Sequence, residues 1–294
     1  MKRHSEKLLV AAFTVFLLCV AAVTTAIAAD AKRIVVAGGD LTEIAYALGA
    51  GDRIIAVDST SNYPAEATKK EQIGYVRRLS AEGILALTPD LLLMAHDAGP
   101  ETAVSQLEGA GVRIAKAPPA DTIDAIPAKI RFVGAELGAQ SGADALAGDV
   151  EAALGDVAER VATLKSSPKV LFVLSLDRGT PLAGGTGTSA DQMIQRAGGT
   201  NAASGFEGYK PMSREAILEA APDVILMMEQ HAERAGGLDA VLGRPEMKLT
   251  PAGQAGNAVA IEGMLLLGFG PRTPQAIAEL ARAIHKDAAT QAGL

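Results

Sequence analysis

A sixteen-residue stretch occurs twice in this chain. Residues 79–94 read LSAEGILALTPDLLLM and residues 212–227 read MSREAILEAAPDVILM, and the ungapped copies agree at eight positions. A Gly-Tyr pair precedes each copy, at 74–75 and at 208–209. Copies this far apart do not form a solenoid, whose repeats recur about every 20–50 residues. The repeat therefore predicts two similar α/β lobes in one chain, with any ligand bound between them.

The N-terminus has the pattern of a secretory signal peptide. A basic segment at 2–7 is followed by an apolar segment at 8–23 and by the small-residue pattern Ala-Ile-Ala that ends at residue 28. A transmembrane anchor is the alternative, but its apolar core needs about 20 residues. We therefore expect residues 1–28 to be removed on export, which places the mature protein in the periplasm.

The chain that remains after this cleavage is acidic and has no cysteine. Loss of Lys2, Arg3, Lys7 and Glu6 leaves 24 basic and 33 acidic side chains, a net charge of −9. A nucleic-acid partner calls for a basic face, so this class is excluded. The only cysteine, Cys19, lies in the signal segment, so the mature chain can form neither disulfides nor thiolate metal sites. Leu18 precedes Cys19 where a lipoprotein signal needs a small residue, which disfavours a lipid anchor.

Strand and helix patterns alternate on both sides of a helical segment. Buried-strand patterns occur at 33–39, 53–57, 91–94, 169–174, 224–227 and 259–261, and helix patterns at 44–48, after Ser80 and at 274–285. Such alternation predicts parallel sheets. Residues 121–164 have only Ala-rich helical spacing, which fits one long helix or two abutting ones. The predicted domains are an N-terminal lobe at 29–120, a bridging helix region at 121–166 and a C-terminal lobe at 167–294.

Ligands of parallel α/β sheets bind beyond the carboxyl ends of the strands, so the loops expected there are the candidate site. These loops are 38–40, 58–63, 75–78, 96–100, 178–188, 209–210 and 229–234. None contains a nucleophile paired with a base, which argues against an exported hydrolase. The glycines at 38–39 lack the spacing of a dinucleotide loop, and those at 184–187 lack the lysine of a phosphate loop. The histidines of the mature chain, His96, His231 and His285, do not have the sequence spacing that is typical of metal ligands.

Residues 73–85 with Pro89-Asp90 resemble the haem-binding periplasmic proteins of bacterial haem ABC importers. Further matching stretches are 38–43, 58–61, 97–100, 196–201 and 267–272, so the resemblance covers essentially the whole mature chain. That family belongs to the helix-bridged class of periplasmic binding proteins, which also includes cobalamin and siderophore receptors. The resemblance implies an α/β fold of two Rossmann-like lobes, each with a central parallel sheet, joined by a long bridging helix.

The resemblance identifies Tyr75 as the axial ligand of ferric haem. Ferric iron is a hard ion and a phenolate oxygen is a hard anionic donor, so the chemistry is sound. A phenol titrates near 10, and a nearby cation favours its ionised form. Arg77 matches the family arginine that hydrogen-bonds the tyrosine oxygen, and Arg78 either shares that role or meets a propionate. A half-buried packing tyrosine is the alternative interpretation of Tyr75.

Contacts from the second lobe are less uniform in that family. Gln230 stands where an arginine that binds a propionate is common, and Lys210, Arg178, His231 or Arg234 are candidates to replace it. Tyr209 and His96 are candidate second contacts. Each of these residues also has an ordinary interpretation as a solvated loop residue.

The glutamates of the repeat, Glu82 and Glu215, each begin a helix. A carboxylate there stabilises the helix through its dipole. In the resembled class one exposed glutamate per lobe also docks onto the membrane permease, and a dimeric partner favours repeated contacts.

The sequence thus predicts a non-enzymatic periplasmic receptor, expected to be a monomer. It would bind haem b as a transported ligand and deliver it to an inner-membrane ABC permease dimer with its ATPase, downstream of an outer-membrane haem receptor. A ferric siderophore, cobalamin or another tetrapyrrole is the alternative ligand on the same fold.

Overall fold

The computed structural model describes residues 31–120, 122–176 and 179–294, so the expected signal segment and Arg178 lie outside the described residues. Contacts divide the chain into two compact units. The first contains the chain up to Pro119 and Ala128–Leu146; the second contains Ala120–Pro127 and Ala147–Leu294. No helix within the described ranges is long and apolar enough to cross a membrane.

A five-stranded parallel sheet forms the centre of the first unit. Its strands are β1 (Ile34–Ala37), β2 (Ile54–Val57), β3 (Glu71–Gln72), β4 (Leu91–Met94) and β5 (Ile114–Lys116), in the order β3-β2-β1-β4-β5. Every residue of β1 and β4 is buried, as expected for parallel strands covered on both faces. The predicted parallel sheet is therefore confirmed in this unit.

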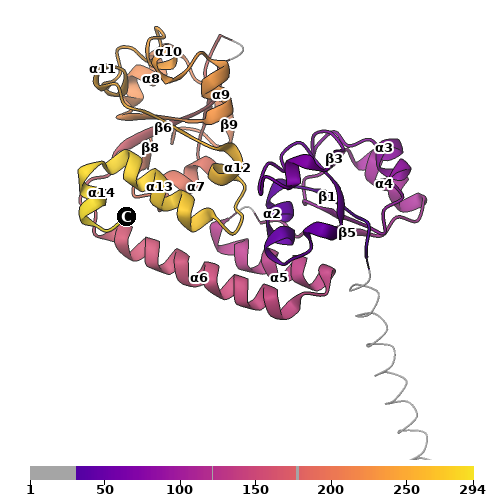
Figure 1. Cartoon of the computed structure of the whole chain (residues 1–294). Helices are drawn as coiled ribbons and strands as arrows, with labels where there is room; N and C mark the ends of the chain where they lie inside the picture. Colours follow the sequence, from indigo (N-terminus) through magenta and orange to yellow (C-terminus); the bar gives the residue numbers. More distant parts are fainter. Residues whose placement is uncertain (1–30, 121, 177–178) are drawn as a thin grey trace, which may run out of the picture. The chain divides into compact units, whose positions relative to one another are not determined.

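Helices cover both faces of the first sheet. They are α2 (Gly39–Ala47), α3 (Ala81–Ala86) and α4 (Glu101–Gly109), with short 3₁₀ turns η1 (Gly51–Arg53) and η2 (Ala67–Lys69). Figure 1 shows α2 on one side of the sheet and α3 with α4 on the other. On the α3 and α4 side, Val35, Ile84, Leu92 and Leu107 belong to one continuous apolar core.

The second unit repeats this arrangement and adds an antiparallel extension. Its strands are β6 (Lys169–Ser175), β7 (Leu182–Gly184), β8 (Thr200–Asn201), β9 (Tyr209–Pro211), β10 (Val224–Met228) and β11 (Ala258–Ile261). Strands β8, β6, β10 and β11 are parallel neighbours in that order, like β2, β1, β4 and β5 of the first unit. Strands β7 and β9 continue the sheet in antiparallel pairing from β6.

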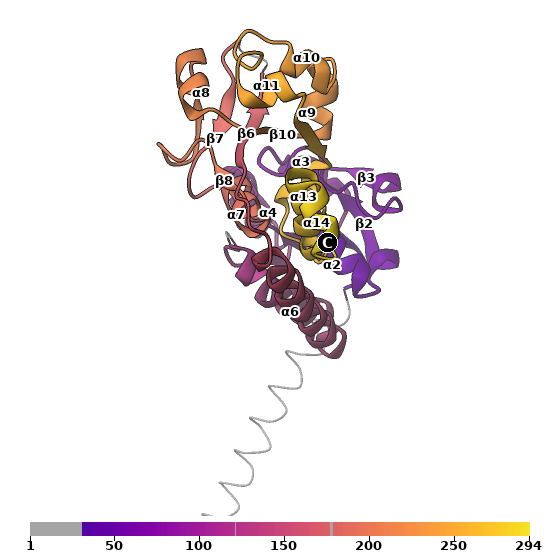
Figure 2. The ribbon, with the colours of Figure 1, turned by 90° about the vertical axis from the view of Figure 1, so that its left-hand side faces the viewer.

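Nine helical segments of the described residues complete the second unit. They are η3 (Ile123–Ala125), α7 (Ser189–Arg196), α8 (Arg214–Ala220), α9 (Glu229–Arg234), α10 (Leu238–Leu242), α11 (Pro251–Ala255), α12 (Gly263–Leu267), α13 (Thr273–His285) and α14 (Asp287–Gln291). Figures 1 and 2 show α7 and α13 on one side of this sheet and α8, α10 and α11 on the other.

The expected bridging region contains two helices, α5 (Ile126–Leu137) and α6 (Gln140–Ala162). Helix α6 contributes residues to both units, because the boundary falls after Leu146. A Cβ atom at Gly134 of α5 would lie only 2.2 Å from the Cβ of Ala143 in α6, so the close approach of these helices requires glycine. Gly138 then ends α5 with a φ of +70°.

Three segments that the sequence suggested were loops are regular elements. Gly184 lies in β7, Tyr209-Lys210 lies in β9, and Glu229–Arg234 forms α9. The β7–β9 ribbon is held by backbone pairing in segments that lack alternating apolar residues, and Ala232 is the one buried residue of α9. Neither segment has enough periodically spaced apolar residues for a strand or a helix to be predicted there from the sequence. Helix α2 also begins at Gly39, ahead of the expected start at 44.

Candidate functional site

The loop that follows β3 presents three polar side chains to solvent. Val76 and Leu79 are buried in the core, whereas Tyr75, Arg77 and Arg78 are exposed. Because the loop is anchored by its apolar residues, the intervening positions must face outward. The expected cluster of a tyrosine and two arginines is therefore present on one surface of the first unit.

Backbone hydrogen bonds tie this loop to two neighbouring loops. The Gly74 carbonyl accepts from Ser59 N at 2.8 Å, and the Val76 carbonyl accepts from Gly99 N at 3.0 Å. Leu79 N in turn donates to the Gly99 carbonyl at 2.8 Å. The loop is thus held at the carboxyl edge of the sheet, between the loops that follow β2 and β4.

Both arginines interact with the Tyr75 side chain. Arg77 Nη1 donates to the phenolic oxygen at 3.1 Å, and the guanidinium carbon of Arg78 lies 5.8 Å from the centroid of the ring. The phenol remains accessible, since Tyr75 is 37% exposed. The phenol of Tyr75 thus has two cationic side chains beside it, and tyrosine oxygen is a known ligand of haem iron.

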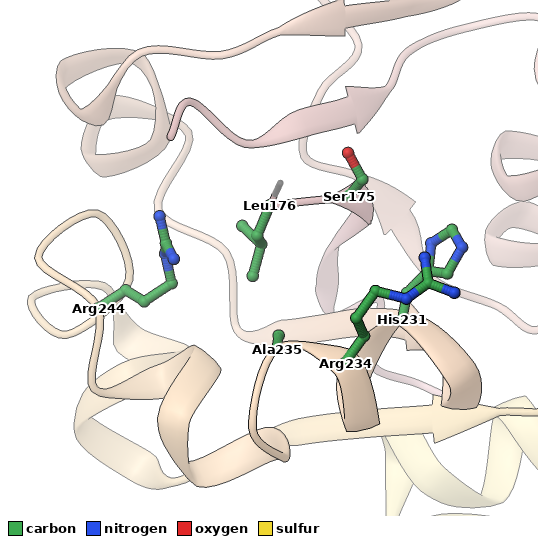
Figure 3. Close-up of a pocket in the computed structure, with 6 residues that line it drawn as sticks. All are labelled: Ser175, Leu176, His231, Arg234, Ala235 and Arg244. Carbon is green, nitrogen blue, oxygen red and sulfur yellow. The ribbon is translucent and has the colours of Figure 1, made fainter. Parts of the chain in front are cut away.

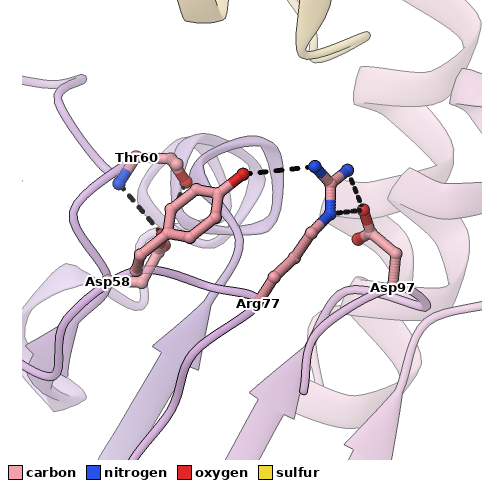
Figure 4. A network of polar contacts seen from close by, with 5 residues as sticks. Asp58, Thr60, Arg77 and Asp97 are labelled. Atoms are coloured by element: carbon pink, nitrogen blue, oxygen red, sulfur yellow. Dashed lines mark hydrogen bonds and ion pairs between the residues drawn. The ribbon is translucent and has the colours of Figure 1, made fainter. Parts of the chain in front are cut away.

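A carboxylate from the β4 loop holds Arg77. Asp97 Oδ2 accepts from Arg77 Nε at 2.8 Å and also from Nη2 (Figure 4). The pKa of Arg77 is raised, chiefly by this hydrogen bond to Asp97 and against the opposing effect of burial. Asp97 lies in one of the stretches that carry the family resemblance, but nothing in its local sequence shows that it faces Arg77.

Asp58 braces the adjoining loops through a fully buried carboxylate. Its oxygens accept from Thr60 N at 2.9 Å and Thr60 Oγ1 at 2.7 Å; Figure 4 shows Asp58 beside Thr60. They also accept from Gly38 N at 2.9 Å and from Ser61 Oγ at 3.0 Å. These four donors occupy the carboxylate. Asp58 therefore supports the turn after β1 and the loop after β2, and it is not a ligand group.

His96 is half-buried in the β4 loop, directly before Asp97. His96 also interacts with another group of the protein, so it is not an unpaired residue. The first unit thus places Tyr75, Arg77, Arg78 and the His96 loop at the same sheet edge.

The candidate residues of the second unit lie on β9 and α9. Tyr209 is 40% exposed and meets the Phe172 ring edge-on at 6.4 Å, while Lys210 Nζ lies 5.8 Å from the centroid of the Phe206 ring. His231 Nδ1 donates to the Leu174 carbonyl.

A polar cavity of about 260 Å³ lies beside α9 (Figure 3). Its lining residues are Ser175, Leu176, His231, Arg234, Ala235 and Arg244. Arg244 also donates to Gly179 O and to Glu246, both at 3.2 Å. Arg244 and Ser175 could not be predicted from the sequence, since neither belongs to a motif and only the fold brings them to His231.

The paired glutamates occupy equivalent positions in the two units. Glu82 and Glu215 are exposed in the first turns of α3 and α8, after the capping residues Ser80 and Ser213. Hydrogen bonds to its own backbone amide and to Ser213 lower the pKa of Glu215. Both carboxylates can therefore stabilise the start of their helices and are also exposed to solvent.

Within the part of the chain that the structure describes, no three or more His, Cys, Asp or Glu side chains converge as a metal site would require. The arrangement around Tyr75 offers a single phenolic oxygen with two arginine side chains beside it. Such a group suits a metal that already carries an equatorial ligand, as haem iron does.

Known proteins share this fold along most of its length. The structure of the periplasmic haem-binding protein RhuT from Roseiflexus sp. RS-1, in apo form, matches with a TM-score of 0.84 and 40% identity over 88% of this chain and 99% of that chain. Further solved periplasmic haem-binding proteins match at 34–39% identity.

Two curated relatives have other descriptions. An uncharacterised ABC transporter substrate-binding lipoprotein of Bacillus subtilis, YvrC, is 28% identical over 88% of this chain and 81% of its own length. A vitamin B12-binding protein of Pectobacterium atrosepticum is 31% identical over 73% of this chain and 76% of its own length.

The family model described as periplasmic binding protein matches residues 34–263. This span includes the described strands of both units, the Tyr75 loop and both copies of the repeat. The chain therefore belongs to the periplasmic binding protein family, the extracytoplasmic and non-enzymatic substrate-binding components of ABC importers.

Proposed function

We propose that this protein is the haem-binding component of a haem importer and that Tyr75 is the axial ligand of the ferric iron. The observation that carries the proposal is the exposed Tyr75 phenol, with Arg77 hydrogen-bonded to its oxygen and Arg78 beside its ring. The similarity to solved haem-binding proteins supports the same ligand.

Cobalamin is the second candidate, because curated relatives are described as vitamin B12-binding proteins. A corrinoid already carries its own axial ligands and does not need an anionic oxygen from the protein. The Tyr75 and Arg77 pair has no function in such a complex, and we therefore place haem first.

Basic side chains near the second unit's strand ends are proposed contacts for ligand carboxylates. Lys210 and His231 are the described candidates, and Arg234 and Arg244 extend the cationic lining around His231. For the glutamates of the repeat, Glu82 and Glu215, we propose contact with the permease.

Titration of the purified protein with ferric haem tests the proposal. We expect saturable binding with the absorbance spectrum of high-spin tyrosinate-ligated iron. Tyr75→Phe should lose that spectrum and bind haem at least about tenfold more weakly, which corresponds to about 1.4 kcal/mol.

Tyr46→Phe is the matched control. Tyr46 lies in α2, and its buried hydroxyl has no hydrogen-bond partner among the described residues, so its removal should leave the spectrum unchanged. Tight binding of cyanocobalamin with no saturable binding of haem would overturn the assignment.

A further inference from the structure

We propose that Asp97 is a positioning residue for the iron ligand: it orients Arg77 so that one guanidinium N–H is directed at the Tyr75 oxygen. Asp97 itself touches neither the phenol nor the iron in this scheme. The inference rests on the proposed function of Tyr75, and it assigns a role to a residue that acts only through its neighbour.

The hydrogen-bond geometry of Arg77 supports this role. Asp97 Oδ2 accepts from Nε at 2.8 Å and from Nη2, while Nη1 donates to Tyr75 Oη at 3.1 Å (Figure 4). A guanidinium is planar, so fixing two of its nitrogens fixes the direction of the third. The side chain of Arg77 is 60% exposed, and without Asp97 it would be free to adopt many rotamers.

The position of Asp97 does not depend on Arg77. Its neighbour Ala98 is buried, and Gly99 makes two backbone hydrogen bonds to the tyrosine loop, to Val76 O and from Leu79 N. These contacts set the β4 loop against the loop after β3. Asp97 therefore acts as a fixed acceptor to which the flexible arginine is tied.

The contacts around Arg77 indicate how Asp97 would act. Arg77 donates its hydrogen bond to the Tyr75 oxygen, the atom proposed to bind the iron, and Arg78 lies over the face of the same ring. The Asp97 carboxylate contacts Arg77, and His96 precedes Asp97 on the same loop. Any effect of Asp97 on the iron-bound oxygen is therefore expected to pass through Arg77.

The experiment is a double-mutant cycle on the full chain loaded with ferric haem. The pH at which half of the tyrosinate band is lost measures competition between the proton and the iron for the phenolate. Asp97→Ala should raise this midpoint by about one unit, a tenfold gain for the proton. Arg77→Ala should raise it at least as much.

The double variant separates positioning from simple electrostatics. If Asp97 acts through Arg77, then Asp97→Ala should not raise the midpoint further when Arg77 is already alanine. An equal rise in both backgrounds, or no rise in the single variant, would overturn the proposal.

Two further variants keep the result interpretable. Asp97→Asn retains an acceptor oxygen for Arg77 and should recover at least half of the shift. Glu101→Ala removes an exposed carboxylate at the start of α4 and should leave the midpoint unchanged. A rise in the Glu101 variant equal to that of Asp97→Ala would also contradict the inference.

The proposed function fails separately from this inference. If Tyr75→Phe keeps the wild-type spectrum, Tyr75 is not the iron ligand, and both this assignment and the positioning role of Asp97 are wrong. If Tyr75→Phe loses the band while Asp97→Ala leaves its midpoint unchanged, only the positioning role is wrong.

Discussion

At the scale of single residues, the candidate site depends on which side chains of a short loop are buried. Val76 and Leu79 enter the core of the first unit, and this burial turns Tyr75, Arg77 and Arg78 outward. The arginine-to-tyrosine hydrogen bond expected from the sequence is present at 3.1 Å. Its carboxylate anchor, Asp97, comes from a loop 20 residues further along the chain.

The two copies of the repeat also share an unusual backbone conformation. Thr88 and Ala221 occupy the same position of the repeat, and both have a positive φ, of 45° and 47°. Both follow the last turn of the repeated helix. A β-branched residue is especially disfavoured in this left-handed region.

We predict that Thr88→Gly raises the free energy of unfolding of the first unit by about 1 kcal/mol. The Thr88 side chain is exposed, so the substitution relieves backbone strain without removing a buried contact. Chemical denaturation measures the change. Ala86→Gly, an exposed position within α3, should instead lower the free energy by about 1 kcal/mol. A destabilised Thr88→Gly protein would contradict the argument.

At the scale of elements, the identities within the repeat have structural explanations. Ser80 and Ser213 cap their helices by accepting from Gly83 N and Ala216 N. The aspartates that follow the shared proline, Asp90 and Asp223, each accept from the backbone at the start of the neighbouring strand.

These strand contacts are closely equivalent. Asp90 Oδ2 accepts from the amides of Lys32 and Arg33 at 2.9 Å, and Asp223 Oδ2 accepts from Lys169 N at 2.8 Å. The repeat therefore encodes a cap, a helix, a left-handed turn and the docking of a strand, once in each unit.

The closing helix α13 carries a buried histidine, His285. His285 Nε2 donates to the Ala197 carbonyl at 3.1 Å, and Nδ1 accepts from Ser166 Oγ at 2.9 Å. Burial lowers the pKa of His285 below its ordinary value of 6.5, against the opposing effect of the Ala197 contact. The folded protein therefore keeps this ring neutral where the unfolded chain takes up a proton.

We predict that this histidine makes the free energy of unfolding fall as the pH drops below about 6.5, with the loss complete below the lowered folded pKa. Thermal unfolding at pH 7.5 and pH 5 measures it. His285→Gln should show a smaller difference between the two pH values than the wild type. Ser166→Ala leaves the ring buried and should retain the wild-type difference. An unchanged difference in His285→Gln would contradict the prediction.

At the scale of the whole molecule, each unit carries one copy of the same surface feature. Glu82 and Glu215 both project from the first turn of a short capped helix next to a central strand. A dimeric permease offers two equivalent surfaces, so a receptor with two related units can present one carboxylate to each.

We predict that the Glu82→Ala/Glu215→Ala variant binds haem like the wild type but supports at least about tenfold less haem uptake, because an interfacial charge pair is worth about 1.5 kcal/mol or more. Uptake by cells whose only receptor is the variant measures the effect. Glu108→Ala/Glu219→Ala removes exposed glutamates from α4 and α8 and should transport normally. Normal uptake by the first variant would disprove the docking role.

The local pattern of the chain was sufficient to predict the two α/β units, the buried parallel strands and the Ser80 cap. Each of these depends on residues close in sequence, where apolar spacing and capping chemistry act directly. The pairing of Tyr75 with Arg77 was expected instead from the resemblance to haem-binding proteins. The tertiary structure alone decided that β7 and β9 pair antiparallel, that Glu229–Arg234 is helical, and that Asp97 meets Arg77. These features arise from contacts between distant segments, which no local pattern records.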